Sequence, residues 1–434
     1  MKYQAYEKYK KSDIEYLEKI PIDWMEQRIK DVGKIFGRIG FRGYTISDMV
    51  DEGEGAITLS PSNINNFNLV LDKCAYISWQ KYNESPEIKV FSNDVIIVKT
   101  GSTIGKATFV PECEKKMTIN PQLIVIKNIK VNFKYLYYLI ISTSFQFEFS
   151  IYTAGGSTPA ISQEKINSFV FPLPVKKIQK IYAEYLGEKT EFIDKKIESL
   201  KKKKEKYFEL KQSLINEVVT KGLDKNAEMK ESGIEWIEKI PKHWEVKRGK
   251  DQFYYNKKIN KGLICKNVLS LTYGGVINKN FNTTAGLNPE SYETYQFVNK
   301  NDLIFKLIDL ENIKTSRVGI VHEDGIMSSA YIRLNPSKYI ISGYYYYLYF
   351  YYYKINLFNY LGGGVRSTLN YSDLLEISII IPPKQEQEKI ISYLDEKTKK
   401  IDNINKTIDK NIRILKEFRK TLINDVMTGK VKVV

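Results

Sequence analysis

Three glycine-rich runs carry hydroxyl and basic side chains that could contact a nucleic acid. They are Gly101-Ser102-Thr103-Ile104-Gly105-Lys106, Gly155-Gly156-Ser157-Thr158 and Gly362-Gly363-Gly364-Val365-Arg366-Ser367-Thr368. Glycine permits close backbone approach, and Ser, Thr and Arg donate hydrogen bonds to phosphates or base edges. Arg366 could bridge guanine O6 and N7 in the major groove. The first run could equally be a structural turn with no contact to DNA. Arg366 could equally form an ion pair at the protein surface.

The full set of candidate DNA contacts adds residues from similar polar loops and from the second copy of the first turn. The candidates are Arg38, Arg42, Ser102, Thr103, Lys106, Ser157, Thr158, Lys306, Arg317, Arg366, Ser367 and Thr368. The first run is not a nucleotide phosphate loop, because its spacing is one residue short and Ala107 replaces the metal-binding hydroxyl.

Catalytic and metal-binding chemistry has little support in this sequence. The two histidines, His243 and His322, lie in no catalytic motif, and no Asn-Pro-Pro-aromatic motif for amino methylation occurs. The three cysteines, Cys74, Cys113 and Cys265, are widely spaced. A zinc site held by cysteines or a disulfide framework is therefore not expected. We expect the protein to lie in a reducing compartment. We expect no catalytic residue, no metal site and no cofactor bound by this chain.

Composition and charge indicate a globular chain with a polyanionic partner. The 434 residues suggest two to four domains, with 43% hydrophobic and 27% charged residues. The formal net charge of +16 favours nucleic acid as that partner, although a generally lysine-rich composition is an alternative. The segment Tyr339 to Leu361 is rich in tyrosine and contains Lys354, so we interpret it as soluble structure without a membrane partner. No secretion signal is recognised at the N-terminus, and we expect a cytoplasmic protein.

A long internal repeat is the most informative feature. At an offset of 220, twelve of the twenty-two positions from Lys10 to Asp31 match their partners, including Trp24 and Trp244. At an offset of 208, Tyr185-Leu186 matches Tyr393-Leu394. Solenoid repeats are only about 20–50 residues long, so this is a tandem duplication of a whole unit. The interiors of the two copies have diverged while their ends have been kept.

Each copy ends in a charged segment with a strict seven-residue apolar series that predicts a helix in a coiled coil. The predicted core positions are Leu186, Ile193, Leu200, Tyr207 and Leu214 in the first segment, and Leu394, Ile401, Ile408, Leu415 and Leu422 in the second. The companion series three residues later is polar, at Lys189, Lys196, Lys203, Lys397 and Asn411. A stripe this narrow does not stabilise a lone helix, so we expect the two helices to pair antiparallel. The alternative is that each helix packs separately on its own domain.

The globular part of each copy is rich in short β-like runs. Strands are expected at 95–98, 123–126, 303–305 and 377–381, and helices near 135–139 and 344–353. We therefore predict two similar α+β domains in tandem, with a curved, partly barrel-like sheet, each followed by a long helix. The predicted boundaries are a first domain at 1–175, a helix at 176–222, a linker at 223–230, a second domain at 231–382, a helix at 383–429 and a tail at 430–434.

The chain resembles the DNA specificity subunits of type I restriction-modification systems over essentially its whole length. The resemblance is carried by the doubled Ile-Glu-Tyr/Trp-x-Glu-Lys-Ile-Pro-x-x-Trp motif, the Gly-Ser-x-Ile-Gly-Lys turn, and helices that open with Gln179 or Gln387. The departure is Lys306-Leu307-Ile308-Asp309, which replaces that turn in the second copy and puts a shared contact role there in doubt.

The resemblance implies a function as well as a fold. Each globular segment would be a target recognition domain that reads one half of a bipartite, asymmetric sequence in double-stranded DNA, and the helices would set the gap between the halves. The subunit would have no catalytic activity. It would recruit two methyltransferase (M) subunits, which use S-adenosylmethionine to methylate adenine at N6, and restriction (R) subunits, which use ATP with Mg for cleavage.

Two other functions stay open at this stage. One is a fused restriction-methylation enzyme, which the missing methylation motif counts against. The other is a coiled-coil adaptor that binds only protein, which would show no salt-dependent binding to DNA.

Overall fold

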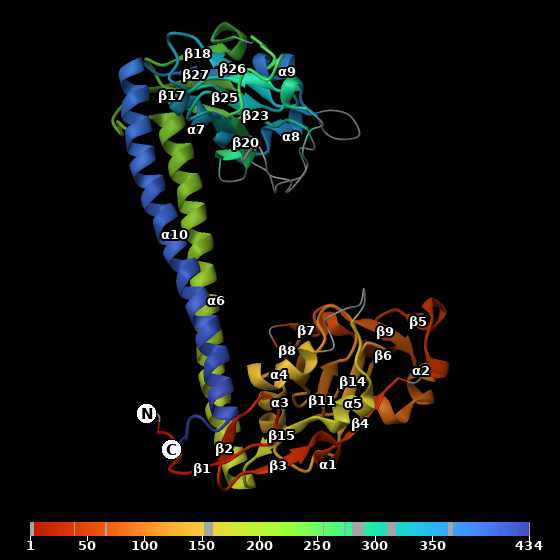
Figure 1. Ribbon diagram of the computed structural model, residues 1–434. Helices are drawn as coiled ribbons and strands as arrows, with labels where there is room; N and C mark the ends of the chain where they lie inside the picture. Colours follow the sequence, from red (N-terminus) through yellow and green to blue (C-terminus); the bar gives the residue numbers. More distant parts are fainter. Residues whose placement is uncertain are drawn as a thin grey trace. The chain divides into compact units, whose positions relative to one another are not determined.

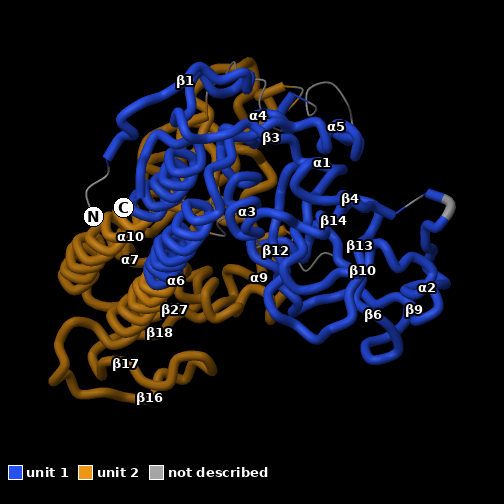
Figure 2. Tube along the Cα trace, turned by 90° about the horizontal axis from the view of Figure 1, so that it is seen from below, with its two compact units in different colours: residues 1–200, 410–434 blue, residues 201–409 orange. Residues whose placement is uncertain are grey.

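The computed structural model divides the chain into two compact units (Figure 2), which are described separately. Unit 1 consists of residues 1–200 and 410–434, and unit 2 of residues 201–409. Each unit therefore contains one globular domain and part of each of two long helices. The structure describes residues 4–38, 40–65 (backbone only at 41), 67–151, 159–254, 256–272, 275–279, 289, 291–308, 310, 318–362 and 368–433.

The first globular domain is built from short strands with short helices among them (Figure 1). Its strands are β1 (Tyr9–Lys11), β2 (Lys19–Pro21), β3 (Met25–Arg28), β4 (Lys34–Gly37), β5 (Met49–Val50), β6 (Gly55–Leu59), β7 (Ile64–Asn65), β8 (Asn68–Leu69), β9 (Ala75–Ser78), β10 (Lys89–Val90), β11 (Val95–Val98), β12 (Ala107–Phe109), β13 (Met117–Ile119), β14 (Leu123–Lys127) and β15 (Val170–Leu173). Its helices are α1 (Ile29–Val32), α2 (Trp79–Glu84), α3 (Phe133–Ile141), α4 (Thr143–Ser150) and α5 (Gln163–Ser168).

Two sheets form the centre of this domain, where a curved, partly barrel-like sheet was predicted. One has the strand order β10-β13-β6-β9-β5, and the other β12-β11-β14-β4. Strand β11 is apolar throughout because both of its faces are covered. Ile96 and Val98 pack between the two sheets, whereas Val95 and Ile97 join the core that contains α3. The predicted strand at 95–98 is thereby confirmed, as is the one at 123–126.

The second globular domain has the same kind of architecture. Its strands are β16 (Met229–Ile234), β17 (Ile237–Pro241), β18 (Glu245–Arg248), β19 (Phe253–Tyr254), β20 (Val268–Thr272), β21 (Gly275–Lys279), β22 (Gln296–Val298), β23 (Leu303–Phe305), β24 (Val318–Ile320), β25 (Gly325–Met327), β26 (Ile332–Pro336) and β27 (Ser378–Ile381). Its helices are α7 (Ser342–Lys354), α8 (Leu357–Leu361) and α9 (Tyr371–Glu376). Its two main sheets run β21-β20-β25-β22 and β19-β26-β23-β24.

The tyrosine-rich segment forms helix α7 in the interior of unit 2. Tyr344, Tyr345 and Tyr352 are fully buried, and their hydroxyls donate to the carbonyls of Val219, Ile380 and Ser378. Buried tyrosine is stable when its hydroxyl finds such a partner. Across the part of the chain that the structure describes, no helix has the length and apolar character needed to span a membrane.

The two long helices, α6 (Lys176–Lys221) and α10 (Lys384–Met427), pair in opposite directions within each unit. In unit 1, Arg419 Nε lies 3.1 Å from Asp194 Oδ1. In unit 2, Nζ of Lys204 and of Lys211 each lie 2.7 Å from Oδ1 of Asp409 and Asp402, respectively. From one ion pair to the next, the residue number on α6 rises by as much as the residue number on α10 falls. The two helices are therefore antiparallel. The predicted fold class, two similar α+β domains with a long antiparallel helix pair, is confirmed.

The second stripe of the helix pair differs from the prediction by one residue. It lies four residues after each core position, at Thr190, Ile197, Lys204, Lys211 and Val218 on α6. The positions expected from the sequence, such as Lys196 and Lys203, are exposed. The prediction failed because Lys204, Lys211 and Arg419 look like surface residues in the sequence. In the structure, carboxylates of the facing helix neutralise them at the seam.

The duplicated motifs join each domain to a helix end. Gly429 and Gly222, which follow α10 and α6, have φ angles of 70° and 76°, a conformation that glycine adopts without strain. A Cβ at Gly429 would lie 3.4 Å from the ring of Trp24, and one at Gly222 would lie 3.1 Å from that of Trp244. Each copy of the motif therefore packs its tryptophan against the end of the long helix that the other copy supplies.

A buried glutamine near the start of each long helix makes the same contacts twice. Gln179 accepts from the backbone N–H of Asn132 at 2.9 Å and donates to the carbonyl of Pro174 at 2.8 Å. Gln387 accepts from Ile341 at 3.0 Å and donates to Pro382 at 2.9 Å. Both side chains satisfy backbone groups that burial would otherwise leave unpaired.

Candidate nucleic-acid interface

The turn between β11 and β12 in unit 1 lies against the segment that follows the second glycine-rich run. The Gly101 N–H donates to the Pro159 carbonyl at 2.8 Å, and the Ile161 N–H donates to the Lys99 carbonyl at 3.0 Å. Gly101 and Gly105 both have positive φ angles, of 105° and 82°, which the tight turn requires. The first run therefore lies beside Pro159 and Ile161, which follow the second run in the sequence, at one edge of the four-stranded sheet.

The same arrangement recurs in unit 2, although the turn sequence has changed. The Leu369 N–H donates to the Leu307 carbonyl at 3.0 Å. Leu307 and Leu369 correspond to Lys99 and Ile161 at the offset of 208. Lys306 is half-buried beside this contact, and Thr368 is exposed. The duplicated scaffold thus brings the connection after β23 next to the end of the third glycine-rich run.

Within the first turn, the candidate side chains differ in their surroundings. Ser102 is exposed and Thr103 is half-buried. Lys106 is half-buried, and its Nζ donates to the Ile64 carbonyl in β7 at 2.9 Å. Beneath the turn, Gln146 of α4 donates to the Gly105 carbonyl at 2.8 Å. Ser102 is therefore the most accessible hydroxyl of this run, while Lys106 also ties the turn to β7.

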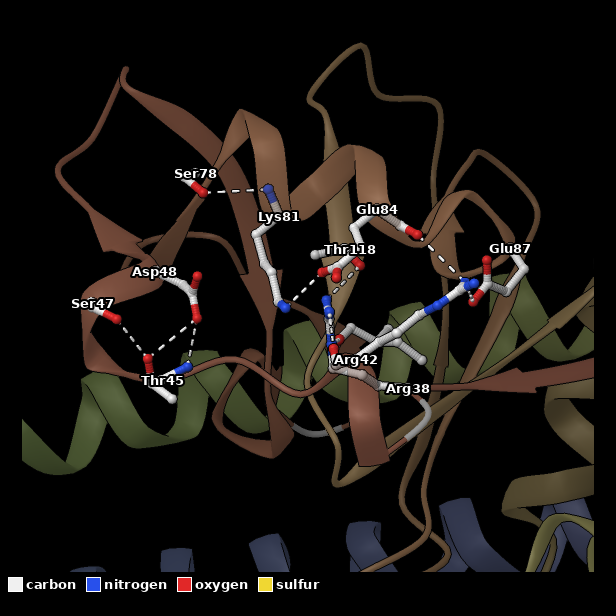
Figure 3. A network of polar contacts seen from close by, with 11 residues as sticks. Arg38, Arg42, Thr45, Ser47, Asp48, Ser78, Lys81, Glu84, Glu87 and Thr118 are labelled. Carbon is white, nitrogen blue, oxygen red and sulfur yellow. Dashed lines mark hydrogen bonds and ion pairs between the residues drawn. The ribbon is translucent and has the colours of Figure 1, made fainter.

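Arg38 is a buried residue with partners inside the domain (Figure 3), whereas an accessible side chain was expected from the sequence. It is 5% exposed, and its guanidinium donates to the Ile119 carbonyl and to Thr118 Oγ1, both at 3.2 Å. Burial lowers the pKa of Arg38 from its ordinary value, and the nearby acidic groups of Tyr44, Glu84 and Glu87 act in the opposite direction. The polar, glycine-rich sequence around it gave no sign of this burial.

Arg42 lies close to Arg38 but at the surface (Figure 3). Its Nη1 is 3.5 Å from Glu87 Oε1 and donates to the Glu84 carbonyl at 3.4 Å. Nearby, Lys81 Nζ is 2.6 Å from Glu84 Oε2. Arg42 and Lys81 are thus paired with carboxylates, so this corner offers less positive potential to phosphates than the sequence suggested.

Five of the twelve candidate contacts lie outside the described residues. They are Ser157, Thr158, Arg317, Arg366 and Ser367. Their described neighbours, Pro159 and Thr368, lie at the two edges described above.

The ten predicted positions of the coiled-coil core all lie inside the helix pair or at its edge. Six of them are buried, at Leu186, Ile193, Leu394, Ile401, Ile408 and Leu422. The other four are half-buried, at Leu200, Tyr207, Leu214 and Leu415.

Contacts between each globular domain and the helix pair were missed in the sequence. In unit 1 the Tyr138 hydroxyl is 3.1 Å from Thr190 Oγ1, and in unit 2 the Tyr347 hydroxyl is 3.2 Å from Thr398 Oγ1. The Tyr347 hydroxyl also donates to Asp395 at 2.6 Å, and burial raises its pKa well above the ordinary value. The signal available in the sequence was that both copies have a threonine at this position, Thr190 and Thr398.

The described residues hold no group of three or more His, Cys, Asp and Glu side chains that could bind a metal ion. The buried acids have structural partners instead. Asp94 accepts from Lys127 at 2.7 Å, and its copy Asp302 accepts from Arg333 at 2.6 Å. Burial raises the pKa of both acids, against the opposing effect of the cation and of a backbone N–H.

Comparisons with known proteins place these features in context. Residues 21–207 and 241–413 match the family described as type I restriction modification DNA specificity domain. The specificity subunit of the type I restriction enzyme MjaIX from Methanocaldococcus jannaschii is 25% identical to this chain over 459 residues. The alignment covers 100% of this chain and 98% of that protein. The MjaVIII specificity subunit of the same organism is 25% identical, with 80% of this chain and 81% of that protein covered.

Two solved structures share the fold. One comes from work on complex assembly and conformational transition of the type I R-M system, and it aligns with a TM-score of 0.66 at 15% identity over 95% of this chain and 99% of the other. The other is the HsdS subunit from Thermoanaerobacter tengcongensis, with a TM-score of 0.50 at 14% identity over 95% and 98% of the two chains.

Proposed function

The chain belongs to the family of type I restriction-modification DNA specificity subunits, with two recognition domains in tandem, and from this premise we propose that each domain reads one half of a bipartite, asymmetric sequence in double-stranded DNA. The observation that carries the proposal is the combination of a retained scaffold with diverged loops. The same sheet edge is built twice, but residues 101–106 and 306–309 differ in sequence. Two different readers on one scaffold suit two different half-sites.

We further propose that the helix pair sets the length of the unread gap. Helix α6 has 46 residues and α10 has 44, and their antiparallel register is held by ion pairs at several levels. A continuous helix is a stiff spacer whose length grows by about 1.5 Å per residue. The length of the helix pair would therefore set the number of base pairs between the two half-sites.

Two methyltransferase subunits are the proposed partners on the helix pair, and restriction subunits would join that complex. In support, Phe418 in unit 1 and Leu210 in unit 2 occupy corresponding positions at the offset of 208 and are 48% and 52% exposed. Ile414 and Phe192 are also exposed in unit 1. Exposed apolar side chains at matched places favour two similar docking sites. In this proposal the chain itself is non-catalytic. S-adenosylmethionine and ATP with Mg are used by the partners.

The decisive experiment is a base-resolution map of N6-methyladenine in cells that carry this gene and its partner genes, with and without the gene. We expect deletion to remove methylation at one split motif, two short blocks around a fixed gap. If the map does not change, the reconstituted complex is tested for preference between a split motif and scrambled DNA. Absence of any preference would contradict the proposal and leave the protein-only adaptor.

A separate prediction concerns the docking positions. Phe418→Glu and Leu210→Glu each place a charge where a partner would bury an apolar surface, so the double variant should bind methyltransferase subunits at least tenfold more weakly. Light scattering of the purified mixture would report the stoichiometry. Asn403→Glu adds the same charge at another exposed position on α10 and is the matched control. Equal binding by both variants would rule out these positions as docking sites.

A further inference from the structure

Unit 1 contains an insertion that unit 2 lacks. Strands β6 and β9 pair antiparallel in unit 1, and β20 and β21 do so in unit 2. In each unit the first strand of the pair also lies parallel to another strand, β13 beside β6 and β25 beside β20. In unit 2, β20 ends at Thr272 and β21 begins at Gly275, whereas in unit 1 residues 60–74 separate β6 from β9. The insertion contains the hairpin β7–β8.

This hairpin is fixed at several points. Ile64 is 1% exposed and packs between the two sheets of unit 1. Lys106 Nζ donates to the Ile64 carbonyl at 2.9 Å, and the Tyr137 hydroxyl donates to the Phe67 carbonyl at 3.0 Å. The Arg419 guanidinium of α10 lies 5.8 Å from the centre of the Phe67 ring. The hairpin is therefore held on the sheet and on the helix pair, as a precise recognition element must be.

Two asparagines face outward from this fixed backbone. Asn65 and Asn68 are direct partners across the hairpin, next to the pair Ile64 and Leu69. Because side chains alternate along a strand, the amides point away from the buried face. Both are exposed, and neither amide has a hydrogen-bond partner among the described residues. By contrast, Asn63 is buried, and its amide donates to two carbonyls at the base of the insertion.

The chemistry of this pair suits a base edge better than a phosphate. A two-stranded ribbon fits the major groove, and an asparagine amide can accept from adenine N6 while it donates to N7. Phosphate binding would need cations, but residues 60–74 contain one lysine, Lys73, and one acid, Asp72. The hairpin also lies beside the turn at 101–106, which contacts Pro159.

We propose that Asn65 and Asn68 are specificity-determining residues that read an adenine in the half-site of the first domain through the major groove. The inference rests on the proposed function and adds the base and the residues to it. An insertion confined to one unit explains how one scaffold can read two different half-sites.

The test is selection of bound sequences from a random duplex library by the complex of the full chain with its methyltransferase subunits. Wild-type protein should select a split motif with an adenine in one half. The variant Asn65→Ala/Asn68→Ala should lose preference for that adenine by about tenfold to a hundredfold, with the other half-site and the gap unchanged. Asn65→Arg should shift the preference at this position towards guanine.

The controls separate this inference from the proposed function. Asn226→Ala removes an exposed asparagine outside the insertion and should leave the motif unchanged. If wild-type protein selects a split motif and the hairpin variants select the same one, this inference is overturned and the function stands. If wild-type protein selects no split motif, the proposed function fails. The single variants decide the matter if circular dichroism shows that the double variant does not fold.

Discussion

At the scale of single residues, the buried cations of this molecule stabilise its sheets. Arg333 is 6% exposed and donates to Asp302, to Asn299 Oδ1 and to the Phe297 carbonyl. Arg38 in unit 1 has a similar environment but bonds to a threonine and to carbonyls instead of an acid. A guanidinium with several fixed donors can satisfy several buried acceptors at once. A basic residue in a polar loop is thus insufficient evidence of a DNA contact.

Arg38 and Arg42 form a matched pair for testing this point. Arg38→Met should lower the free energy of unfolding by about 2 kcal/mol, because the carbonyl of Ile119 and the hydroxyl of Thr118 lose their donors. Arg42→Met removes a surface ion pair and should cost about 1 kcal/mol or less. Denaturant-induced unfolding measures both. Equal losses would show that Arg38 does not have the structural role assigned to it here.

At the scale of elements, the helix pair repeats its polar contacts along with its core. Asp194 and Arg419 in unit 1 correspond at the offset of 208 to Asp402 and Lys211 in unit 2. The pair between Lys204 and Asp409 has no such copy, because the corresponding residues are Ile412 and Lys201. Charged residues at an otherwise apolar seam fix register more than they add stability.

The helix pair can be shortened without loss of this register. Residues 201–207 of α6 align with residues 406–412 of α10 in the antiparallel register, since Lys204 contacts Asp409. Deletion of both stretches removes one heptad from each helix, or about 10 Å. At about 3.4 Å per base pair, the recognised gap should shorten by about three base pairs while both half-sites are kept. Methylation mapping of the variant complex checks this.

Deletion of residues 201–207 alone is the control for the helix pair. It shifts the core of α6 against that of α10 and should abolish recognition altogether. A gap of unchanged length in the double deletion would mean that the helices do not set the spacing.

At the scale of the whole molecule, the chain is one domain-plus-helix unit written twice, and each globular domain should therefore be exchangeable. Replacement of residues 1–175 with the corresponding domain of another family member should change one half-site and leave the second half-site intact. The modular interpretation would be abandoned if both half-sites changed.

The affinity of the complex for DNA should also fall steeply with salt concentration. We expect a loss of roughly a thousandfold or more between about 50 and 200 mM salt if at least six phosphates are contacted.

Much of the fold could be predicted because its signals are local or periodic. Apolar heptads gave the two long helices, and the apolar runs at 95–98 and 303–305 gave strands that are covered on both faces. Duplication of the Trp24 and Trp244 motif predicted two copies of one scaffold. The contacts of these tryptophans with Gly429 and Gly222 could not be predicted, because they join positions far apart in the chain.

The sequence by itself determined that this protein has two similar domains and two paired helices, since periodicity and repetition are properties of the chain. Only the tertiary structure decided which polar residues are free to act. It buried Arg38, placed Lys204 and Lys211 at the helix seam, and left Asn65 and Asn68 exposed on a fixed hairpin. The physical reason is that burial and pairing of a polar side chain depend on which distant acceptors the fold brings within hydrogen-bond distance.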